Sequence, residues 1–560
     1  MERKKNIVVR GKIKNISLKI IVVAIVSALL LTSSGCGFLS GLFSYRRRVV
    51  NFDSMEYSRP DVDGLCKKIT DLSNKISTPG EDFSAQLSEL QELNVLLENV
   101  YTMRTLSEIH FYIDTGDAKW ADETDYFAMA SAELSKNLEA LYIACADSEN
   151  CSRFEAECFG EGFLEPYKGQ SGMSDRELQL LQREASLLNE YTAYDYDRIF
   201  DAYGTDYDAM YKKINSDLGS LMVELVKIRK ETARLRGYDN YIDYAYDSLS
   251  RDYTPDEARA LLDGIVEKIV PIFTEARNAG KYDNDGSLPR LSAGRISDVA
   301  REGLKKLDKR FIESLDFMEK YNLYYLGYDS KQADVSFTTY LFSYDAPYML
   351  IHGAGDMYDL MTFIHELGHF TDNYYNYGSN FDIDQSEIAS QALEMLFLCN
   401  ADGCGLSEDE LASLEAMKFA DTLTIYVIQG MYYRFEDRLY ALPDDELTLE
   451  KINGLANEVL QEFGLTSYYS DFPTLWVTVP HFFESAFYVI SYITSNSAAL
   501  EIYETELAGK GSGVDLYFAL INWDPEKTFR ENLSRVSMRD PFSGEAVDNL
   551  AKTLKAMMLE

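Results

Sequence analysis

Most of the chain places apolar residues at the three- and four-residue steps of an α-helix. Leu87, Leu90, Leu97 and Tyr101 fall on one helical face near the start. Helix starts carry capping boxes, in which a Ser or Thr precedes a Glu by three residues. Such boxes begin at Ser174, Thr254 and Ser407. The pattern therefore predicts a mainly helical body.

One stretch departs from the helical period. Over residues 335–341 two sets of side chains alternate, as in a half-buried strand: Val335, Phe337, Thr339 and Leu341 on one face, and Ser336, Thr338 and Tyr340 on the other. Residues 344–347 predict a turn, and residues 348–351 a returning strand. A helix is then predicted over 356–375. We expect a small β-sheet immediately before that helix.

The N-terminus has the layout of an export signal. Seven Lys and Arg residues within the first 19 positions precede a mostly apolar run of 12 residues, Ile20 to Leu31. That run is short for a bilayer span, which disfavours a retained anchor. The small residues before Cys36 resemble a bacterial lipoprotein signal, although Ser33 replaces the usual aliphatic residue. Ordinary signal cleavage is the other alternative.

These features predict how the chain is divided. We expect residues 1–35 to be a lipoprotein-type signal peptide, Cys36 to carry the lipid, and residues 36–52 to be a tether. The protein would then lie on the outer face of a bacterial cytoplasmic membrane. The remaining length allows an N-terminal helical domain, 53–199, and a catalytic domain, 200–560.

Composition narrows the possible partners. The chain has 92 Asp and Glu against 54 Lys and Arg, a net charge of −38. Such a surface repels phosphate backbones, so nucleic-acid binding is excluded. Hydrophobic residues make up 46% of the chain, as in globular proteins. We expect a monomer or a weak oligomer.

Six cysteines remain besides Cys36. Cys399 and Cys404 are close enough in sequence to bridge a turn, and unpaired buried thiols are the alternative. Their spacing does not fit a structural zinc site, so no chemistry is assigned to them.

Candidate chemistry centres on residues 365–369, which have the form His-Glu-x-x-His. On a helix, His365 and His369 lie one turn apart and can bind one zinc ion. Glu366 lies beside them, where it can reach a zinc-bound water. Two surface histidines on a helix are the alternative. Because the whole chain has only five histidines, an accidental pair is disfavoured.

A catalytic zinc site needs a third protein ligand and one open position. The downstream candidates are Asp382, Asp384, Glu387 and Glu394. A second helix is predicted over 386–399, and packing antiparallel to the first it would bring Glu387 to the metal. Glu394, on the same face, could then hydrogen-bond the far nitrogen of a ligand histidine. The alternative for Glu394 is a solvated or helix-pairing carboxylate.

The zinc motif followed by Glu387 to Gln391 resembles the M3 family of metallopeptidases, especially its oligoendopeptidase F branch. Weaker resemblances occur at Tyr57 to Asp61 and at Arg539 to Gly544. The resemblance implies a large multi-helix zincin body with a deep substrate channel. It also implies that Glu387 is the third ligand of a single Zn²⁺ ion, and that short unstructured peptides are the substrates.

The family also has a His and Tyr segment opposite the metal, which corresponds here to His481 to Tyr492. The resemblance implies that His481 and either Tyr488 or Tyr492 stabilise the oxyanion. A core aromatic stripe is the alternative for the tyrosines. His352, at the end of the predicted sheet, could contact substrate or be structural. His110 is expected to be structural.

Together these observations predict a zinc-dependent oligoendopeptidase in which Glu366 is the general base on a zinc-bound water. Two alternatives remain open: a zincin of another family, with a different third ligand such as Glu394, and a lipid-anchored helical protein that binds peptides without cleaving them.

Overall fold

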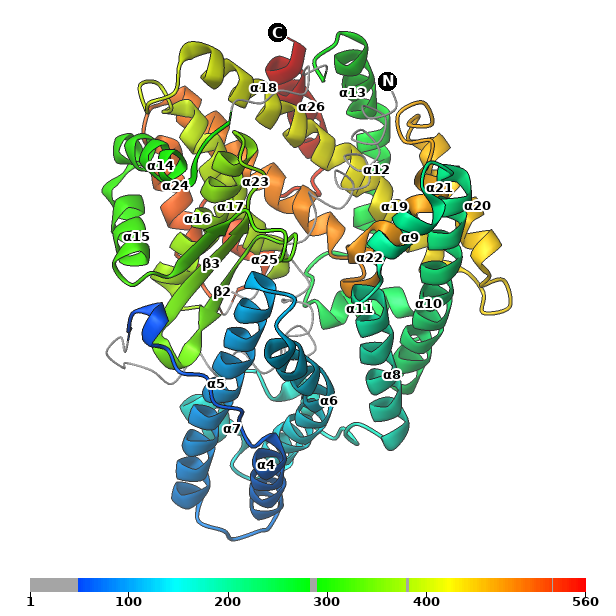
Figure 1. Cartoon of the computed structure of the whole chain (residues 1–560). Coiled ribbons are helices and arrows are strands. Elements are labelled where there is room, and N and C mark those ends of the chain that lie inside the picture. Colours follow the sequence, from blue (N-terminus) through cyan, green and yellow to red (C-terminus); the bar gives the residue numbers. More distant parts are fainter. Residues whose placement is uncertain (1–48, 283–289, 379–381, 526, 560) are drawn as a thin grey trace.

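The computed structural model describes residues 49–282, 290–378, 382–525 and 527–559. Their arrangement is mainly helical, with one small sheet beside the central helices (Figure 1). The export signal, the tether and Cys36 lie outside the described residues, apart from positions 49–52. Within the described ranges, no helix combines the length and apolar character needed to cross a bilayer.

The first described helices project below the sheet in Figure 1. They are α4 (Val62–Ile76), α5 (Phe83–Ile113) and α6 (Ala118–Asp147), followed by the short α7 (Cys151–Phe154). Each of the three long helices starts at an aspartate, namely Asp61, Asp82 and Asp117, whose carboxylate accepts a backbone N–H of the first turn.

A second helical group includes α8 and α10, which lie on the right of Figure 1. Its elements are α8 (Asp175–Thr192), α9 (Tyr196–Tyr203), α10 (Tyr207–Leu235), α11 (Tyr241–Ser248), α12 (Pro255–Lys268) and α13 (Val270–Asn278). The capping boxes predicted at Ser174, Thr254 and Ser407 are confirmed, with both reciprocal hydrogen bonds present in each.

The predicted sheet is confirmed and has a third strand. After α14 (Ala293–Leu307) and α15 (Lys309–Lys320) come β1 (Tyr324–Gly327), β2 (Phe337–Leu341) and β3 (Ala346–His352). The order is β1-β3-β2, with β2 antiparallel and β1 parallel to the central β3.

The turn between β2 and β3 is shorter than predicted. Asp345 adopts a left-handed φ of 48°, which reverses the chain, and β3 already begins at Ala346. Strand β1 was not predicted. This strand has only four residues and no apolar–polar alternation, so it carries no strand signature of its own.

The helix with the His-Glu-x-x-His motif is α16 (Tyr358–Asn376), and the next is α17 (Ile383–Cys399). Both were predicted, although α17 starts three residues earlier because the Asp382 carboxylate caps it. The chain continues through α18 (Glu408–Thr424), α19 (Gly430–Ala441), α20 (Leu449–Glu462), α21 (Phe472–Leu475), α22 (Pro480–Glu484), α23 (Val489–Ala508), α24 (Ser512–Ile521), α25 (Phe529–Arg535) and α26 (Ala546–Leu559).

Buried side chains form two large hydrophobic cores. The first joins the N-terminal helices, the sheet, α14 to α16 and α24, and the second joins α8, α10 to α13, α19, α20 and α26. Helices α17 and α23 contribute to both. Leu396 and Met395 of α17 belong to the first and second core, as do Ala499 and Ile493 of α23. This helix pair therefore forms the seam between the two halves.

All six cysteines in the described ranges are free thiols. The possible bridge between Cys399 and Cys404 is thus absent, and the alternative of unpaired thiols is confirmed.

Candidate metal and catalytic site

Helices α16 and α17 approach each other unusually closely at Gly368, inside the zinc motif. A Cβ atom at this position would lie 2.5 Å from the carbonyl oxygen of Ala389 and 2.5 Å from the Cα of Ser390. Since these are backbone atoms, they cannot move aside without displacing α17. The glycine therefore lets the second helix bring its carboxylates to the two histidines.

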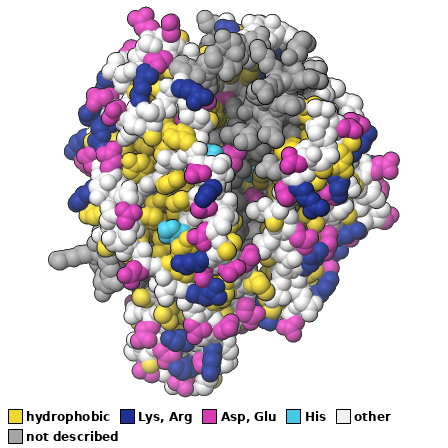
Figure 2. Space-filling view, in the orientation of Figure 1, with side chains coloured by type: hydrophobic (Ala, Val, Ile, Leu, Met, Phe, Trp, Pro, Cys, Tyr) yellow, Lys and Arg dark blue, Asp and Glu magenta, His cyan; other side chains and the backbone are white. Residues whose placement is uncertain are grey.

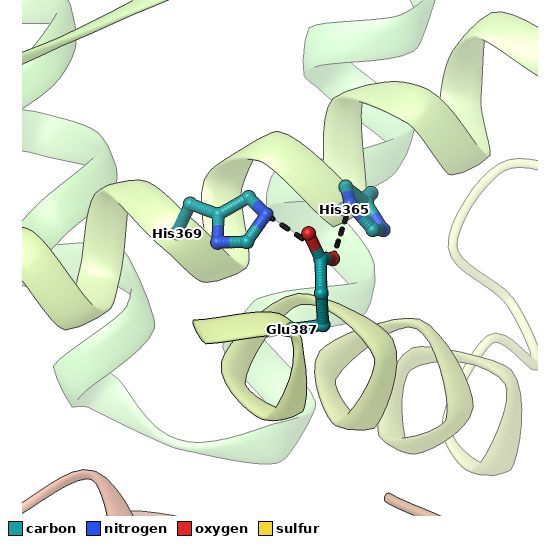
Figure 3. A group of neighbouring side chains, drawn as sticks. All are labelled: His365, His369 and Glu387. Carbon is teal, nitrogen blue, oxygen red and sulfur yellow. Dashed lines mark ion pairs between the residues drawn. The ribbon is translucent and has the colours of Figure 1, made fainter. Parts of the chain in front are cut away.

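Three side chains converge at this crossing (Figure 3). His365 Nε2 lies 3.3 Å and His369 Nε2 lies 3.5 Å from Glu387 Oε2. One donor atom from each residue falls within 4.8 Å of the other two. His369 Nε2 is buried and makes no hydrogen bond within the described part of the chain. Two imidazoles and one carboxylate are a donor set that catalytic zinc prefers, so these residues fit the ion.

A further layer of contacts orients the three residues. His365 Nδ1 is 2.8 Å from Glu394 Oε1, the contact predicted for Glu394. The other oxygen of Glu394 accepts from Lys418 Nζ at 2.6 Å. Lys418, on α18, is 4% exposed, and no local spacing in the sequence points to it. Glu387 Oε2 accepts from the Ser390 hydroxyl at 3.1 Å.

The electrostatics of this group favour a cation. Burial opposes protonation of His365, but hydrogen bonds to Glu387 and Glu394 outweigh it and raise the pKa of His365 to about 10. Burial likewise opposes ionisation of Glu387, but His369 and His365 hold its pKa well below the usual value. The carboxylates are therefore ionised and face nitrogens that attract positive charge.

Glu366 points into the same region from α16 and is fully buried. The hydroxyl of Thr338, on β2, donates to Glu366 Oε2 at 2.9 Å and lies 3.0 Å from the Glu366 carbonyl oxygen. Glu366 Oε1 has no hydrogen-bond partner among the described residues. Burial raises the pKa of Glu366, which makes it a stronger base than an exposed carboxylate.

Residues 481–492, here named the wall segment, bring an imidazole and two phenols to the site. His481 Nε2 lies 3.3 Å from the Tyr492 hydroxyl. The Tyr488 hydroxyl donates to Glu387 Oε1 at 3.2 Å. Tyr488 is 2% exposed, whereas Tyr492 is only partly buried. The two tyrosines therefore differ: one touches the predicted metal ligand and the other touches His481.

Burial also sets the protonation of these groups. It lowers the pKa of His481 to about 3, so this imidazole is neutral near pH 7. It raises the pKa of both Tyr488 and Tyr492 well above the usual value, so both phenols stay protonated and can donate.

Comparison with known families identifies the chain. Residues 52–166 match the peptidase M3 N-terminal domain, and residues 312–550 match peptidase family M3. Together the two matches span more than half of the sequence. The chain belongs to peptidase family M3.

By sequence, this M3 metallopeptidase is similar to the chromosomal oligoendopeptidase F of Lactococcus lactis subsp. cremoris, with 31% identity over 183 residues. That match covers 30% of the chain and 29% of the relative, so less than a third of the relative's length is spanned.

Solved structures show that the fold extends over nearly the whole chain. A crystal structure assigned as oligoendopeptidase F has a TM-score of 0.78 at 19% identity and covers 91% of this chain and 99% of its own. PZ peptidase A with an inhibitor has a TM-score of 0.78 at 18% identity, covering 90% and 99%. A structure assigned as oligoendopeptidase F from Bacillus anthracis str. Ames has a TM-score of 0.76 at 20% identity, covering 91% and 98%.

The other candidate residues of this M3 chain have contacts elsewhere. His352, at the end of β3, has its Nε2 4.0 Å from Asp334 Oδ1, and its described contacts do not include the metal group. Asp384 accepts from the Tyr253 hydroxyl at 2.9 Å and does not join the three ligands. His110 stacks on Trp120 with ring centroids 4.4 Å apart, as expected for a structural residue.

Proposed function

We propose that this M3 chain is a zinc-dependent oligoendopeptidase that hydrolyses short, unstructured peptides. The observation that carries the proposal is the convergence of His365, His369 and Glu387 beside a buried Glu366. These residues would hold one zinc ion, which when bound polarises a peptide carbonyl and makes a water acidic enough to attack it.

Glu366 acts as the general base in this proposal. The Thr338 hydroxyl holds one carboxylate oxygen, while Oε1 has no partner among the described residues and can take a proton. The raised pKa of Glu366 suits a group that first accepts a proton from the attacking water and then delivers it to the leaving amine.

The wall segment stabilises the negative charge that develops on the peptide oxygen. The neutral His481 and the protonated Tyr492 are donors in a buried region, where hydrogen bonds to a developing charge are strong. Tyr488 has a different role, because its hydroxyl already donates to Glu387 and thereby orients that ligand.

The substrate class follows from access to this site. The surface is hollowed between the half that carries the sheet and the half that carries α8 and α10 (Figure 2). Strand β2 is at an edge of the sheet, and its Thr338 touches Glu366. A peptide paired along that edge would run past the metal residues without strong sequence selection, and a folded protein could not do so. In this proposal His352, at the end of the neighbouring β3, contacts the substrate.

The decisive experiment compares the wild-type protein with Glu366→Gln on a quenched fluorescent peptide, with and without a chelator. We expect one zinc per chain in both proteins. Cleavage by the variant should fall about 10²–10⁴-fold, because the base is removed while the ligands remain. Retained turnover in a zinc-loaded Glu366→Gln variant would exclude this mechanism.

The two alternatives are tested by the same assay. A peptide-binding protein without activity would bind the substrate but leave it intact in the zinc-loaded wild type. A zincin that uses Glu394 as third ligand is disfavoured, because Glu394 contacts the far nitrogen of His365 and also pairs with Lys418.

We further propose that the protein is exported and anchored through a lipid on Cys36. The support is the basic N-terminus, the short apolar run and the small residues before the cysteine. Expression in bacteria with a labelled fatty acid should label the wild type and leave Cys36→Ser unlabelled. Equal labelling of both would refute the anchor.

A further inference from the structure

The wall segment is contacted by buried ionisable side chains that the proposed reaction does not use. Arg229 lies on α10, Arg251 lies between α11 and α12, and Glu436 lies on α19. The side chains of Arg229 and Arg251 are 5% and 0% exposed, and Glu436 is 0% exposed. Three separate segments of the chain thus send ionisable side chains to one short stretch of backbone.

Phe487, in the middle of the wall segment, is the main point of contact. Its φ of +66° is left-handed, a conformation that a bulky residue rarely adopts unless its surroundings enforce it. Its N–H donates to Glu436 Oε1 at 3.0 Å, and its carbonyl oxygen accepts from Arg251 Nη2 at 2.6 Å. A buried carboxyl group and a buried guanidinium therefore hold both polar groups of the residue that directly precedes Tyr488.

Arg251 also links the wall segment to the ligand helix. Its Nη2 donates to the Ser491 hydroxyl at 3.1 Å, one residue before Tyr492. Its Nε lies 3.7 Å from Asp384 Oδ2, on α17, three residues before Glu387. One guanidinium thus connects the residues that precede both tyrosines, Phe487 through its backbone and Ser491 through its hydroxyl, with the helix that carries the predicted third ligand.

Arg229 holds the other end of the wall segment. Its Nη1 donates to the carbonyl oxygen of Phe482 at 3.3 Å, and its Nη2 donates to that of Phe483. Both carbonyls belong to α22, the short helix that carries His481. The helix is too short to satisfy its own C-terminal carbonyls, so the arginine substitutes for the missing donors.

Stability alone does not explain Arg251 and Glu436. Nε and Nη1 of Arg251 and Oε2 of Glu436 have no hydrogen-bond partner among the described residues. Buried polar groups whose hydrogen-bonding capacity is incompletely used are costly, and apolar replacements of similar size are often at least as stable. What the three residues share is that each bonds the backbone of the wall segment.

We propose that Arg229, Arg251 and Glu436 are positioning residues that hold the wall segment in place opposite the metal ligands before substrate arrives. This inference rests on the proposed peptidase function, because it assigns His481 and Tyr492 as donors to the oxyanion. Donors fixed in advance need no rearrangement during the reaction, which is the condition under which such donors are most effective.

The first test is a matched pair at one position. Glu436→Gln keeps a carbonyl oxygen for the Phe487 N–H, whereas Glu436→Met removes the acceptor at similar size. We expect Glu436→Gln to retain kcat within about threefold, and Glu436→Met to lose about 10²-fold in kcat with little change in KM or zinc content, as for a small misplacement of catalytic groups.

Glu506→Met is the control for simple destabilisation. Glu506 is also a buried carboxylate that accepts backbone N–H groups, those of Gly511 and Gly513, at the far end of α23. It should lower the melting temperature but leave kcat unchanged. Equal kcat losses in Glu436→Met and Glu506→Met, or a wild-type kcat in Glu436→Met, would overturn the proposal.

Amide hydrogen exchange separates this inference from the proposed function. The Phe487 amide of the wild type should exchange slowly, and Glu436→Met should accelerate exchange across residues 481–492 whether or not peptides are cleaved. If zinc-loaded wild type cleaves nothing, the proposed function fails while exchange still decides the positioning role. Rapid exchange of Phe487 in the wild type overturns that role even if no variant folds.

Arg251→Met, compared with Arg277→Met, provides an independent second variant. Arg277 stacks on Phe273, Tyr282 and Tyr468, and it has no described contact with the wall segment. We expect a large loss of kcat only in Arg251→Met, with zinc retained. The same loss in both variants at equal thermal destabilisation would count against positioning.

Discussion

The ligand side of the site, on α16 and α17, is held by close helix packing, whereas the wall segment is held by buried ionisable side chains from other parts of the chain. On the ligand side, Gly368 allows two helices to touch, and the donors then follow from helical spacing. In the wall segment, Phe487 has a strained backbone that Arg251 and Glu436 hold. Regular helices position metal ligands through their own spacing and packing, whereas an irregular segment needs polar contacts from residues of other elements.

The largest effect on catalysis should come from replacing the two tyrosines one at a time. Tyr492→Phe removes a donor to the oxyanion and should lower kcat about 10²–10³-fold with zinc affinity unchanged. Tyr488→Phe removes a hydrogen bond to Glu387 and should instead weaken zinc binding by about tenfold. Steady-state kinetics and competition with a zinc-binding dye measure both. If Tyr488→Phe lowered kcat and Tyr492→Phe weakened zinc binding instead, the roles assigned to the two tyrosines would be reversed.

Gly368→Ala tests whether packing alone sets the ligand geometry. The added methyl group meets the backbone of α17 at 2.5 Å, so the helices must separate. We expect a loss of about 1–3 kcal/mol in the free energy of unfolding and a clear loss of zinc affinity. Gly454→Ala, inside α20 and with no atom within 4 Å of the new Cβ, is the control. Full zinc affinity in Gly368→Ala would show that the close approach is not needed.

Lys418→Met probes a long-range charge on the ligand side. Burial opposes ionisation of Glu394, and Lys418 with His365 lowers its pKa nevertheless. Without the lysine, Glu394 orients His365 less well, and zinc affinity should fall about 10–100-fold. Lys268→Met, at an exposed ion pair with Asp548, should change nothing. Unchanged zinc binding in Lys418→Met would leave the lysine a purely structural role.

The smallest expected effect is a change in how thermal stability depends on pH. Burial raises the pKa of Glu436 from 4.5 to about 8. Between these values the folded protein binds more protons than the unfolded chain, so wild-type stability falls as pH rises through this window. Glu436→Gln lacks the titrating group, and its melting temperature should exceed that of the wild type by about 1–3 °C at pH 9 and match it near pH 5. Parallel melting curves at all pH values would contradict the shift.

This difference between the two sides also explains what the sequence could predict. His365, Glu366 and His369 are recognisable because their spacing is local, and the capping box at Thr254 is local as well. The contact between Glu394 and His365 was predictable once α17 was taken to pack against α16.

The residues that hold the site residues in place from other elements have no recognisable local spacing in the sequence. Lys418, Thr338 and Arg251 reach it from other elements, and only the fold brings them together. Strand β1 was missed for a related reason, because its four residues become a strand only by pairing with β3. The choice between Tyr488 and Tyr492 likewise depended on which neighbour each hydroxyl meets.

Helices α17 and α23 belong to both hydrophobic cores, and this sharing has a consequence for the order of assembly. A chain in which only the first core has folded would have the two histidines and Glu387, whose neighbours Ile388 and Ala389 belong to that core, but no wall segment opposite them. A chain in which only the second has folded would have His481 without a metal pair to face. Neither half is an active fragment, so peptide cleavage requires both cores, whereas zinc retention reports only that the first core has folded.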